Sequence, residues 1–349
     1  MKLNKIAKGY NLGKVISSNE IIGGYNSRNY DLLTSKGHFF IRKFVSHRQK
    51  DQIKLELNFL DYLKNERFPC VPALRTTEGD LYLNTLEGNF ALFEWQASEP
   101  YDNQLESTAL CLSQLHKLST NYKRIVSGRD CLDKCFDNDI DCAKKILSGN
   151  DIIHQSNLPI CHPLKNKELF KINEINKINI RRLFKEYFNN FIVPKANEYS
   201  KIVSLFEYSS FNKPIIHGDF IARNISYKNE AVFCVYDFDS MREDVLAADL
   251  AISIFDFCLD TKKKETVFNQ KKLSAFIDAY KSKLPITKKD IKLMKLTYLN
   301  GALNLFFFGL NHFFLKNDNR YLNLLNVSEK LASLYSNPDT ENQLCEATL

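Results

Sequence analysis

Two carboxylates and an amide near the middle of the chain have a spacing that suits phosphoryl transfer. The segment IIHGDFIARNISY contains Asp219 directly after His217 and Gly218, and Asn224 follows five residues later. Asp237 closes the next apolar run, in the segment YDFDS. Transfer of a phosphoryl group needs a carboxylate near the acceptor hydroxyl and oxygen ligands for Mg²⁺ on the phosphates. We therefore expect Asp219 to act as the catalytic base, and Asn224 and Asp237 to bind the metal.

The order of these residues matches the catalytic segment of protein kinases. That template has H-R-D, four residues and Asn, followed by a D-F-G triplet. Here Gly218 replaces the Arg, and Asp239 replaces the last Gly. An isolated His-Gly-Asp triplet is weak evidence and is also compatible with ordinary loop chemistry. The complete ordered set indicates a kinase catalytic loop followed by a metal-binding strand.

The same segment resembles the aminoglycoside phosphotransferase and choline kinase-like family of small-molecule kinases. The family pattern H-G-D-x-x-x-x-N, followed by I-D-F/W, is similar to HGDFIARN and VYDFD in this chain. The segment LAADLA resembles the D-L-A signature of the family and contributes Asp249, and LSQLHKL resembles its L-x-x-L-H helix. The resemblance covers roughly residues 20–315. It implies an α+β fold with two lobes, like that of protein kinases.

The resemblance also implies an ATP site in the N-terminal part of the chain. IIGGYNSRNY looks like the nucleotide loop, although a Gly-Gly turn alone would indicate a plain hairpin. FFIRKF offers two cations on opposite faces of a strand, and we expect Arg42 rather than Lys43 to bind the α- and β-phosphates. FALFEWQ resembles the hinge whose backbone receives the adenine edge. The residues expected at the nucleotide are Gly23, Gly24, Asn26, Ser27, Phe40, Arg42, Glu56, Phe93 and Trp95.

Two of these residues carry specific expectations. Phe40 lies two residues before Arg42 on the same strand face, where its ring could stack on adenine. Glu56 would be the carboxylate partner of Arg42, but its place near Lys54 also suits an exposed glutamate on a helix.

Hydrophobic patterns predict the elements that must position the nucleotide site. Residues 15–45 have the composition of strands and turns, with two β-rich runs joined at Ser-Lys-Gly. Residues 80–95 predict a hairpin with Glu87-Gly88-Asn89 at its turn. Between them, residues 51–66 predict an amphipathic helix. The apolar residues on one face of that helix are Ile53, Leu57, Leu60 and Leu63.

The pattern becomes helical after Trp95. Residues 103–119, most of residues 165–208 and the chain from Val245 to its end predict helices. We expect a nucleotide-binding N-terminal lobe with a small antiparallel sheet at residues 1–96. A larger helical C-terminal lobe at residues 97–349 would hold the catalytic loop, the metal site and the acceptor pocket.

The bulk composition excludes several other classes of protein. The chain has 349 residues, of which 44% are hydrophobic and 26% charged, as in folded globular proteins. Its net charge of +7 accompanies no nucleic-acid-binding motif, so we expect no nucleic-acid partner. Nine cysteines without a CxxC pair indicate reduced thiols in the cytoplasm. The N-terminus lacks an apolar signal segment, and asparagines interrupt the apolar residues 293–315, which predicts a buried helix and no membrane partner.

Several polar residues near the motif have structural alternatives. We expect His217 to organise its loop, Asp249 to be structural and His116 to be a packed helix residue. Asp239 suits either a second metal contact or, slightly better, a turn residue. Arg223 suits equally well a contact to the transferred phosphate and a surface charge.

The leading hypothesis is a kinase that moves the γ-phosphate of ATP, with Mg²⁺, to a small-molecule hydroxyl. The acceptors that the resemblance implies include homoserine, choline and other amino alcohols, methylthioribose, hexosamines and aminoglycosides, and YDFDS is slightly closer to homoserine and sugar kinases. From Ile215 to Asp260, three basic and nine acidic residues give 3 − 9 = −6, which suits a cationic acceptor or a solvated surface. A protein kinase is less compatible, because HGD replaces HRD and no A-P-E segment follows. A third hypothesis is a kinase-shaped binding or structural protein without turnover; the oligomeric state stays open.

Overall fold

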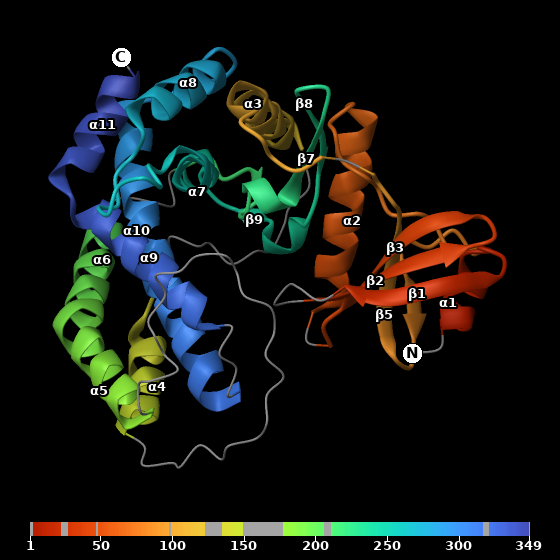
Figure 1. The fold of residues 1–349 in the computed structure, drawn as a ribbon, viewed down its shortest axis with the longest axis horizontal. Coiled ribbons are helices and arrows are strands. Elements are labelled where there is room, and N and C mark those ends of the chain that lie inside the picture. The colour runs from red at the N-terminus through yellow and green to blue at the C-terminus, as the bar shows by residue number, and fades with distance from the viewer. Residues whose placement is uncertain are drawn as a thin grey trace. The chain divides into compact units, whose positions relative to one another are not determined.

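In the computed structural model, the described residues are 3–21, 27–46, 48–97, 99–122, 135–148, 177–205, 211–316 and 321–348 (Figure 1). Contacts divide the chain into two units. The first combines Met1–Gly128 with Pro214–Asp249 and Ser274–Pro285, and the second holds the rest. The N-terminal sheet and the predicted catalytic segment therefore lie in one unit. The lobe boundary expected after residue 96 stays a prediction.

The first unit is built on a five-stranded antiparallel sheet with the strand order β1-β2-β3-β5-β4. The predicted β-rich runs form β2 and β3, which are joined at Ser35 and Lys36. The strands are β1 (Val15–Ile21), β2 (Ser27–Thr34), β3 (Gly37–Phe44), β4 (Leu83–Thr85) and β5 (Gly88–Glu94).

The predicted hairpin at residues 80–95 forms, but its turn lies earlier than expected. Gly88 already pairs with Thr85, so the two turn residues are Leu86 and Glu87. Gly88 has a φ of +129°, which only glycine adopts easily, and this lets the strand begin immediately after the turn. The expectation that Gly88 and Asn89 lie in the turn was therefore wrong.

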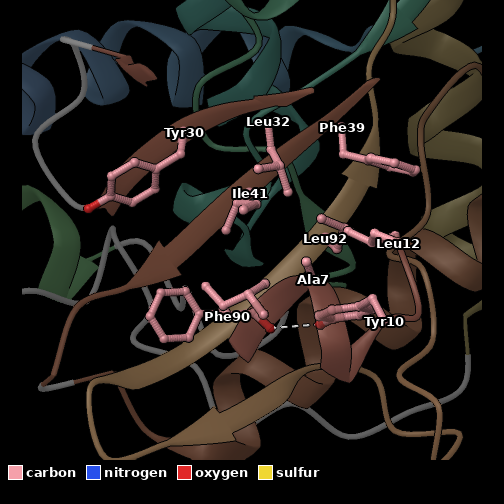
Figure 2. Packing of buried hydrophobic residues seen from close by; sticks show 10 residues of the cluster. Ala7, Tyr10, Leu12, Tyr30, Leu32, Phe39, Ile41, Phe90 and Leu92 are labelled. Atoms are coloured by element: carbon pink, nitrogen blue, oxygen red, sulfur yellow. Dashed lines mark hydrogen bonds between the residues drawn. The ribbon is translucent and has the colours of Figure 1, made fainter. Parts of the chain in front are cut away.

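One face of the sheet forms a hydrophobic core with the short helix α1 (Leu3–Gly9) (Figure 2). The hydroxyl of Tyr10, just after this helix, donates a 2.9 Å hydrogen bond to the Phe90 carbonyl oxygen. Side chains alternate between faces along a strand, so every second residue of β2, β3 and β5 enters this core. These strand residues are Tyr30, Leu32, Phe39, Ile41, Phe90 and Leu92.

The residues between them face the opposite side of the sheet. Arg42 pairs with Asn29 on β2 and with Ala91 on β5, and Phe40 pairs with Phe93. Directly opposed residues share a face in an antiparallel pair. The side of the sheet away from α1 therefore carries the predicted nucleotide residues.

Helix α2 (Lys50–Asn65) connects this face of the sheet to the catalytic segment. Figure 1 shows α2 between the sheet and the hairpin of β7 and β8. Glu56 contacts Arg42 of β3, and the Phe59 ring lies 6.3 Å from the Phe238 ring. The predicted apolar face is confirmed, because the four residues on it are buried: Ile53, Leu57, Leu60 and Leu63.

The catalytic segment forms short strands and turns, as its apolar runs predicted. The pairing partners are β6 (Ile215–Ile216) with β9 (Arg242–Glu243), and β7 (Ile225–Lys228) with β8 (Ala231–Val235). Two 3₁₀ turns, η4 (Ala222–Asn224) and η5 (Phe238–Ser240), lie before and after the hairpin of β7 and β8. The predicted helix around residues 103–119 is α3 (Leu105–Asn121).

The remainder of the described chain is mainly helical, which confirms the predicted α+β class. In the segment predicted as helical at residues 165–208, residues 177–205 are helical and the others lie outside the described residues. Within the described part of the chain, no helix is long and apolar enough to cross a membrane. The helices are α4 (Asp137–Ser148), α5 (Lys177–Tyr187), α6 (Val193–Leu205), α7 (Leu246–Cys258), α8 (Gln270–Lys281), α9 (Lys288–Lys316), α10 (Leu322–Ser336) and α11 (Pro338–Thr348), with a π-helical turn η2 (Phe188–Ile192) between α5 and α6.

We predict that Leu32→Ala destabilises the first unit while Leu33→Ala does not. Leu32 is 0% exposed in the sheet core, whereas the adjacent Leu33 is 38% exposed. Truncating a buried leucine to alanine costs about 2–5 kcal/mol, because contacts are lost and a cavity remains. The matched surface change should stay within about 0.5 kcal/mol. Thermal unfolding of both variants measures the difference, and equal losses would contradict the assigned register of β2.

Candidate active site

Asp219 is held by two donors from its own loop. Its Oδ2 accepts hydrogen bonds from Asn224 Nδ2 at 2.9 Å and from Arg223 Nη2 at 3.0 Å. Asn224 Nδ2 also donates to the Asp219 carbonyl oxygen at 2.9 Å. The carboxylate predicted as the base is therefore fixed in orientation. The contact between Arg223 and the transferred phosphate stays a prediction.

Gly218 is the position at which this loop tolerates no side chain. Its φ is +78°, in the left-handed region that glycine enters without strain. A Cβ atom at this residue would press against Arg242 Nη1 and the Ser240 carbonyl oxygen, closer than any allowed contact. The loop can therefore turn sharply beside β9 only because residue 218 is glycine.

His217 orders the loop through both ring nitrogens. Nδ1 accepts a hydrogen bond from the Asp219 backbone N–H at 3.2 Å, and Nε2 lies 2.8 Å from the Tyr236 carbonyl oxygen. A carbonyl only accepts, so Nε2 carries the proton and the imidazole is neutral in this arrangement. His217 is fully buried. This geometry agrees with the predicted role of organising the loop.

Asp249, in the first turn of α7, binds the backbone of the loop that contains His217 and Gly218. Its carboxylate accepts the backbone N–H groups of His217 and Gly218, both at 2.8 Å. His116 Nε2 lies 3.2 Å from the same carboxylate, and His116 Nδ1 lies 2.7 Å from the Tyr280 hydroxyl. Burial alone would raise the pKa of Asp249, but the bond and charge of His116 lower it below its ordinary value. Both residues have the structural roles expected of them.

The hairpin of β7 and β8 brings the two predicted metal ligands together. The Tyr236 N–H donates to the Asn224 carbonyl oxygen at 2.8 Å, so Asp237 is the residue that follows the partner of Asn224. Asp237 has a left-handed φ of +58°, and its side chain is 42% exposed. The described residues contain no cluster of three or more His, Cys, Asp or Glu side chains able to hold a metal. Mg²⁺ nevertheless needs only one or two protein ligands when phosphates supply the rest.

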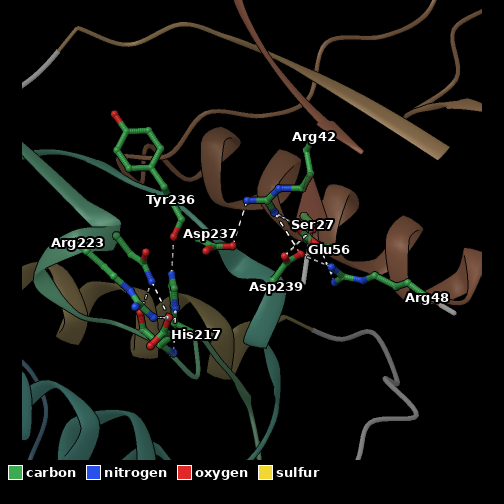
Figure 3. Close-up of polar contacts among 11 residues, drawn as sticks. Ser27, Arg42, Arg48, Glu56, His217, Arg223, Tyr236, Asp237 and Asp239 are labelled. Atoms are coloured by element: carbon green, nitrogen blue, oxygen red, sulfur yellow. Dashed lines mark hydrogen bonds and ion pairs between the residues drawn. The ribbon is translucent and has the colours of Figure 1, made fainter. Parts of the chain in front are cut away.

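Arg42 is surrounded by three carboxylates (Figure 3). Its Nη1 lies 2.9 Å from Glu56 Oε1 and 3.3 Å from Asp239 Oδ1, and its Nη2 lies 3.1 Å from Asp237 Oδ1. Burial alone would lower the pKa of Arg42, but the carboxylates of Asp239, Glu56 and Asp237 raise it. Arg42 Nε is buried and donates to no group in the described part of the chain. The exposed-helix alternative for Glu56 is wrong, because this residue is fully buried.

Arg48 belongs to the same cluster, although no pattern in the sequence indicated it. Its Nη2 forms a 2.6 Å ion pair with Glu56 Oε2, and its Nη1 contacts Asp239 Oδ1. Asp239 lies in the turn η5, as expected, and its Oδ2 also accepts a 2.9 Å bond from the Ser27 hydroxyl. Burial would raise the pKa of Asp239, but Arg42 and Arg48 lower it. Asp239 is therefore an ion-pair partner as well as a turn residue.

A cavity of about 340 Å³ lies on this face of the sheet. Phe40 and Phe93, whose ring centres are 6.1 Å apart, line its apolar part. Arg42, Glu56 and Asp237 line its charged part. Arg223 also lines the cavity and joins it to Asp219 through its hydrogen bond. The structure thus brings most predicted site residues together, while Gly23, Gly24 and Asn26 lie outside the described residues.

The predicted hinge runs along one side of the cavity. Glu94, Trp95 and Gln96 all line it. The Trp95 N–H donates to the His38 carbonyl oxygen at 3.1 Å, and the two rings stack with centres 4.4 Å apart. Backbone groups alternate in direction along an antiparallel strand. Because Trp95 bonds to β3, the neighbouring Glu94 has its N–H and carbonyl oxygen directed away from β3.

Comparison with known proteins points to one class of enzyme. The model of the phosphotransferase enzyme family matches residues 18–129. Homoserine kinase from Methylobacillus glycogenes is 22% identical over 288 residues, which cover 81% of this chain and 76% of that protein. A spectinomycin phosphotransferase solved with ADP and spectinomycin has a TM-score of 0.64 at 12% identity, covering 99% of this chain and 97% of its own. A microcompartment-associated aminopropanol kinase has a TM-score of 0.59 at 13% identity, covering 99% and 98%.

These findings confirm the predicted resemblance and the kinase-like fold. The solved structures are too distant in sequence to show more than the fold. Together with the family match and the homoserine kinase relatives, they support an ATP-dependent kinase that acts on a small-molecule hydroxyl. The roles of single residues stay predictions.

We predict that Gly218→Ala lowers turnover of ATP by about 100-fold, the cost of a small misplacement of a catalytic group. The added methyl group would push the loop that holds Asp219 away from Arg242 and Ser240. Gly79→Ala is the matched control, because Gly79 also has a positive φ, +88°, but a Cβ there meets no atom within 4 Å. This control should lose about 1–2 kcal/mol of stability and keep its turnover. Similar steady-state rates for both variants would contradict the account of Gly218.

Proposed function

We propose that this chain transfers the γ-phosphoryl group of ATP to the hydroxyl of a small amino alcohol, with homoserine as the first candidate. The observation that carries the proposal is the grouping of Asp219, Asn224 and Asp237 beside a cavity whose charged end contains Arg42. Phosphoryl transfer depends mostly on positioning and on charge stabilisation, which these groups supply.

The cavity suits the nucleotide in size and polarity. Its volume of about 340 Å³ lies within the range of small-molecule pockets, about 300–1,000 Å³. The rings of Phe40 and Phe93 would contact the adenine faces, and the Glu94 backbone would bind the adenine edge. The triphosphate would then extend toward Arg42, whose buried Nε has no hydrogen-bond acceptor among the described residues. Gly23, Gly24, Asn26 and Ser27 remain proposed contacts to the phosphates.

Asn224 and Asp237 are suitable ligands for Mg²⁺. Both described hydrogen bonds of the Asn224 side chain use its nitrogen, which leaves the amide oxygen for the ion. Asp237 is partly exposed and has one described bond, to Arg42. Hard oxygen donors of this kind suit Mg²⁺, which would supply positive charge against the negative charge of the phosphates.

Asp219 would act on the acceptor hydroxyl. An alcohol is far less acidic than a carboxylic acid, so Asp219 need not remove the proton beforehand. It would orient the hydroxyl and accept the proton late, while Arg223 and Asn224 hold the carboxylate. The lone pairs not used by these two donors would face the acceptor.

The choice of acceptor rests on the relatives. Homoserine kinases are among the curated relatives, and an aminopropanol kinase shares the fold. Both names denote compounds that carry an amine and a hydroxyl, which supports an amino alcohol as the acceptor. We also propose a cytoplasmic location, which the free cysteines among the described residues support. The lobe boundary after residue 96 is a further proposal.

We predict that Asp219→Asn lowers kcat by about two to four orders of magnitude, the range for loss of a general base. Asparagine keeps the shape and can still accept from Arg223 and Asn224, but it lacks the charge that takes up the proton. Calorimetry should show nearly unchanged binding of MgATP. Asp237→Asn is the contrasting variant, which should weaken MgATP binding. If Asp219→Asn keeps kcat within a few-fold, this residue is not the base, and if MgATP binding collapses, its role is structural.

We predict that ADP release in a coupled assay responds most strongly to amino alcohols. The panel would contain homoserine, choline, aminopropanol, glucosamine and an aminoglycoside, each with and without Mg²⁺. Homoserine should give the highest kcat/KM, and removing the ammonium group by using a plain hydroxy acid should lower it. A peptide substrate that outperforms every small molecule would support the protein-kinase alternative and refute the proposal.

A further inference from the structure

The charged cluster on the cavity face contains more negative groups than one arginine can balance. Arg42 contacts Glu56, Asp237 and Asp239, which gives +1 − 3 = −2 in a mostly buried place. Arg48 contacts two of the same carboxylates and changes the sum to +2 − 3 = −1. The balance of charge around Arg42 therefore depends on a second arginine outside the strand.

We propose that Arg48 is a positioning residue for the nucleotide, which binds Glu56 and Asp239 so that Arg42 stays available to the triphosphate. The inference rests on the proposed ATP site. Arg48 does not itself line the cavity and has no described contact with Asn224 or Asp237, but its partner Glu56 does line the cavity. It acts through the carboxylates that it shares with Arg42.

The fold holds Arg48 rigidly in this position. The residue lies between β3 and α2, and its N–H donates to the Val45 carbonyl oxygen at 3.1 Å. Its guanidinium lies over the Phe44 ring, 5.3 Å from the centre, and the side chain is only 13% exposed. A planar guanidinium can bind one carboxylate with each terminal nitrogen, as here with Glu56 and Asp239. A lysine ammonium would present a single point of charge to both.

Arg48 limits how strongly Glu56 and Asp239 bind Arg42. Glu56 uses Oε1 for Arg42 and Oε2 for Arg48, so its charge is divided between them. Asp239 Oδ1 is shared as well, and its distance to Arg42 is the longest of the three, 3.3 Å. Without Arg48, the negative charges of Glu56 and Asp239 would be balanced by Arg42 alone. The electrostatic attraction of Arg42 for a phosphate group would therefore be weaker.

Asp239 extends the same effect to the predicted nucleotide loop. Its Oδ2 accepts the Ser27 hydroxyl at 2.9 Å, and Ser27 is the first residue of β2 after that loop. Arg48 thus connects α2, η5 and the start of β2 through one pair of carboxylates. A change at Arg48 should affect the phosphate end of the nucleotide and spare the adenine end.

The test compares two ligands on the full chain. Calorimetry would measure the Kd of MgATP and of adenosine, which has no phosphates, for the wild type and Arg48→Met. We expect the Kd of MgATP to rise about 10- to 100-fold, by analogy with the loss of a group that orients a metal ligand. The Kd of adenosine should stay within about two-fold. Arg75→Met is the matched control, because Arg75 forms an exposed ion pair with Asp61 and should change neither value.

A second variant separates charge balance from folding. Adding Asp239→Asn to Arg48→Met restores the sum around Arg42 to +1 − 2 = −1, so the double variant should regain part of the MgATP affinity. A double variant that binds MgATP more weakly than Arg48→Met would overturn the inference. So would unchanged MgATP binding in Arg48→Met, or equal weakening of both ligands. If the wild type binds adenosine but not MgATP, or neither, the proposed function fails first and removes this inference with it.

Discussion

The buried charges around Arg42 are the interaction on which the arrangement of the site depends. Burying Glu56 or Asp239 without a partner would cost several kcal/mol, and their ion pairs with Arg42 offset this cost where β3, α2 and η5 meet. A buried ion pair is weak evidence for stability, because an apolar core often does as well. The ion pairs of this cluster position the elements of the site. They hold β3, α2 and η5 around one cavity and place Arg42 in its lining.

The catalytic loop is held by a different principle, the satisfaction of backbone groups. Asp249 accepts two consecutive backbone N–H groups, and His217 bonds both to its own loop and to the strand that precedes Asp237. Gly218 lets the chain turn where any side chain would collide. The loop and the ion cluster meet at Asp237, which follows the hairpin and contacts Arg42. Rigid backbone on one side and charge on the other together define the site.

The alternation of side chains along β3 places one residue in the hydrophobic core and the next in the ion cluster. Ile41 enters the core beside α1, and its neighbour Arg42 faces the cavity. A shift of one residue in the pairing of β3 would exchange these faces, so the core would lose Ile41 and the cavity would lose Arg42. The same alternation explains why Phe40 and Phe93 line the cavity while their strand neighbours Phe39, Ile41 and Leu92 enter the core.

Features that depend on local spacing could be predicted from the amino-acid sequence. The order of Asp219, Asn224 and Asp237 indicated a catalytic loop followed by a metal-binding strand, and the apolar repeat at residues 51–66 predicted the buried face of α2. The ion-pair partners of Arg48 became apparent only from the folded structure. Its contact to Asp239 spans 191 residues, and a loop arginine among other polar residues has no periodic signal. The two residues of an ion pair can be far apart in the sequence, so the role of Arg48 can be recognised only after distant elements have packed together.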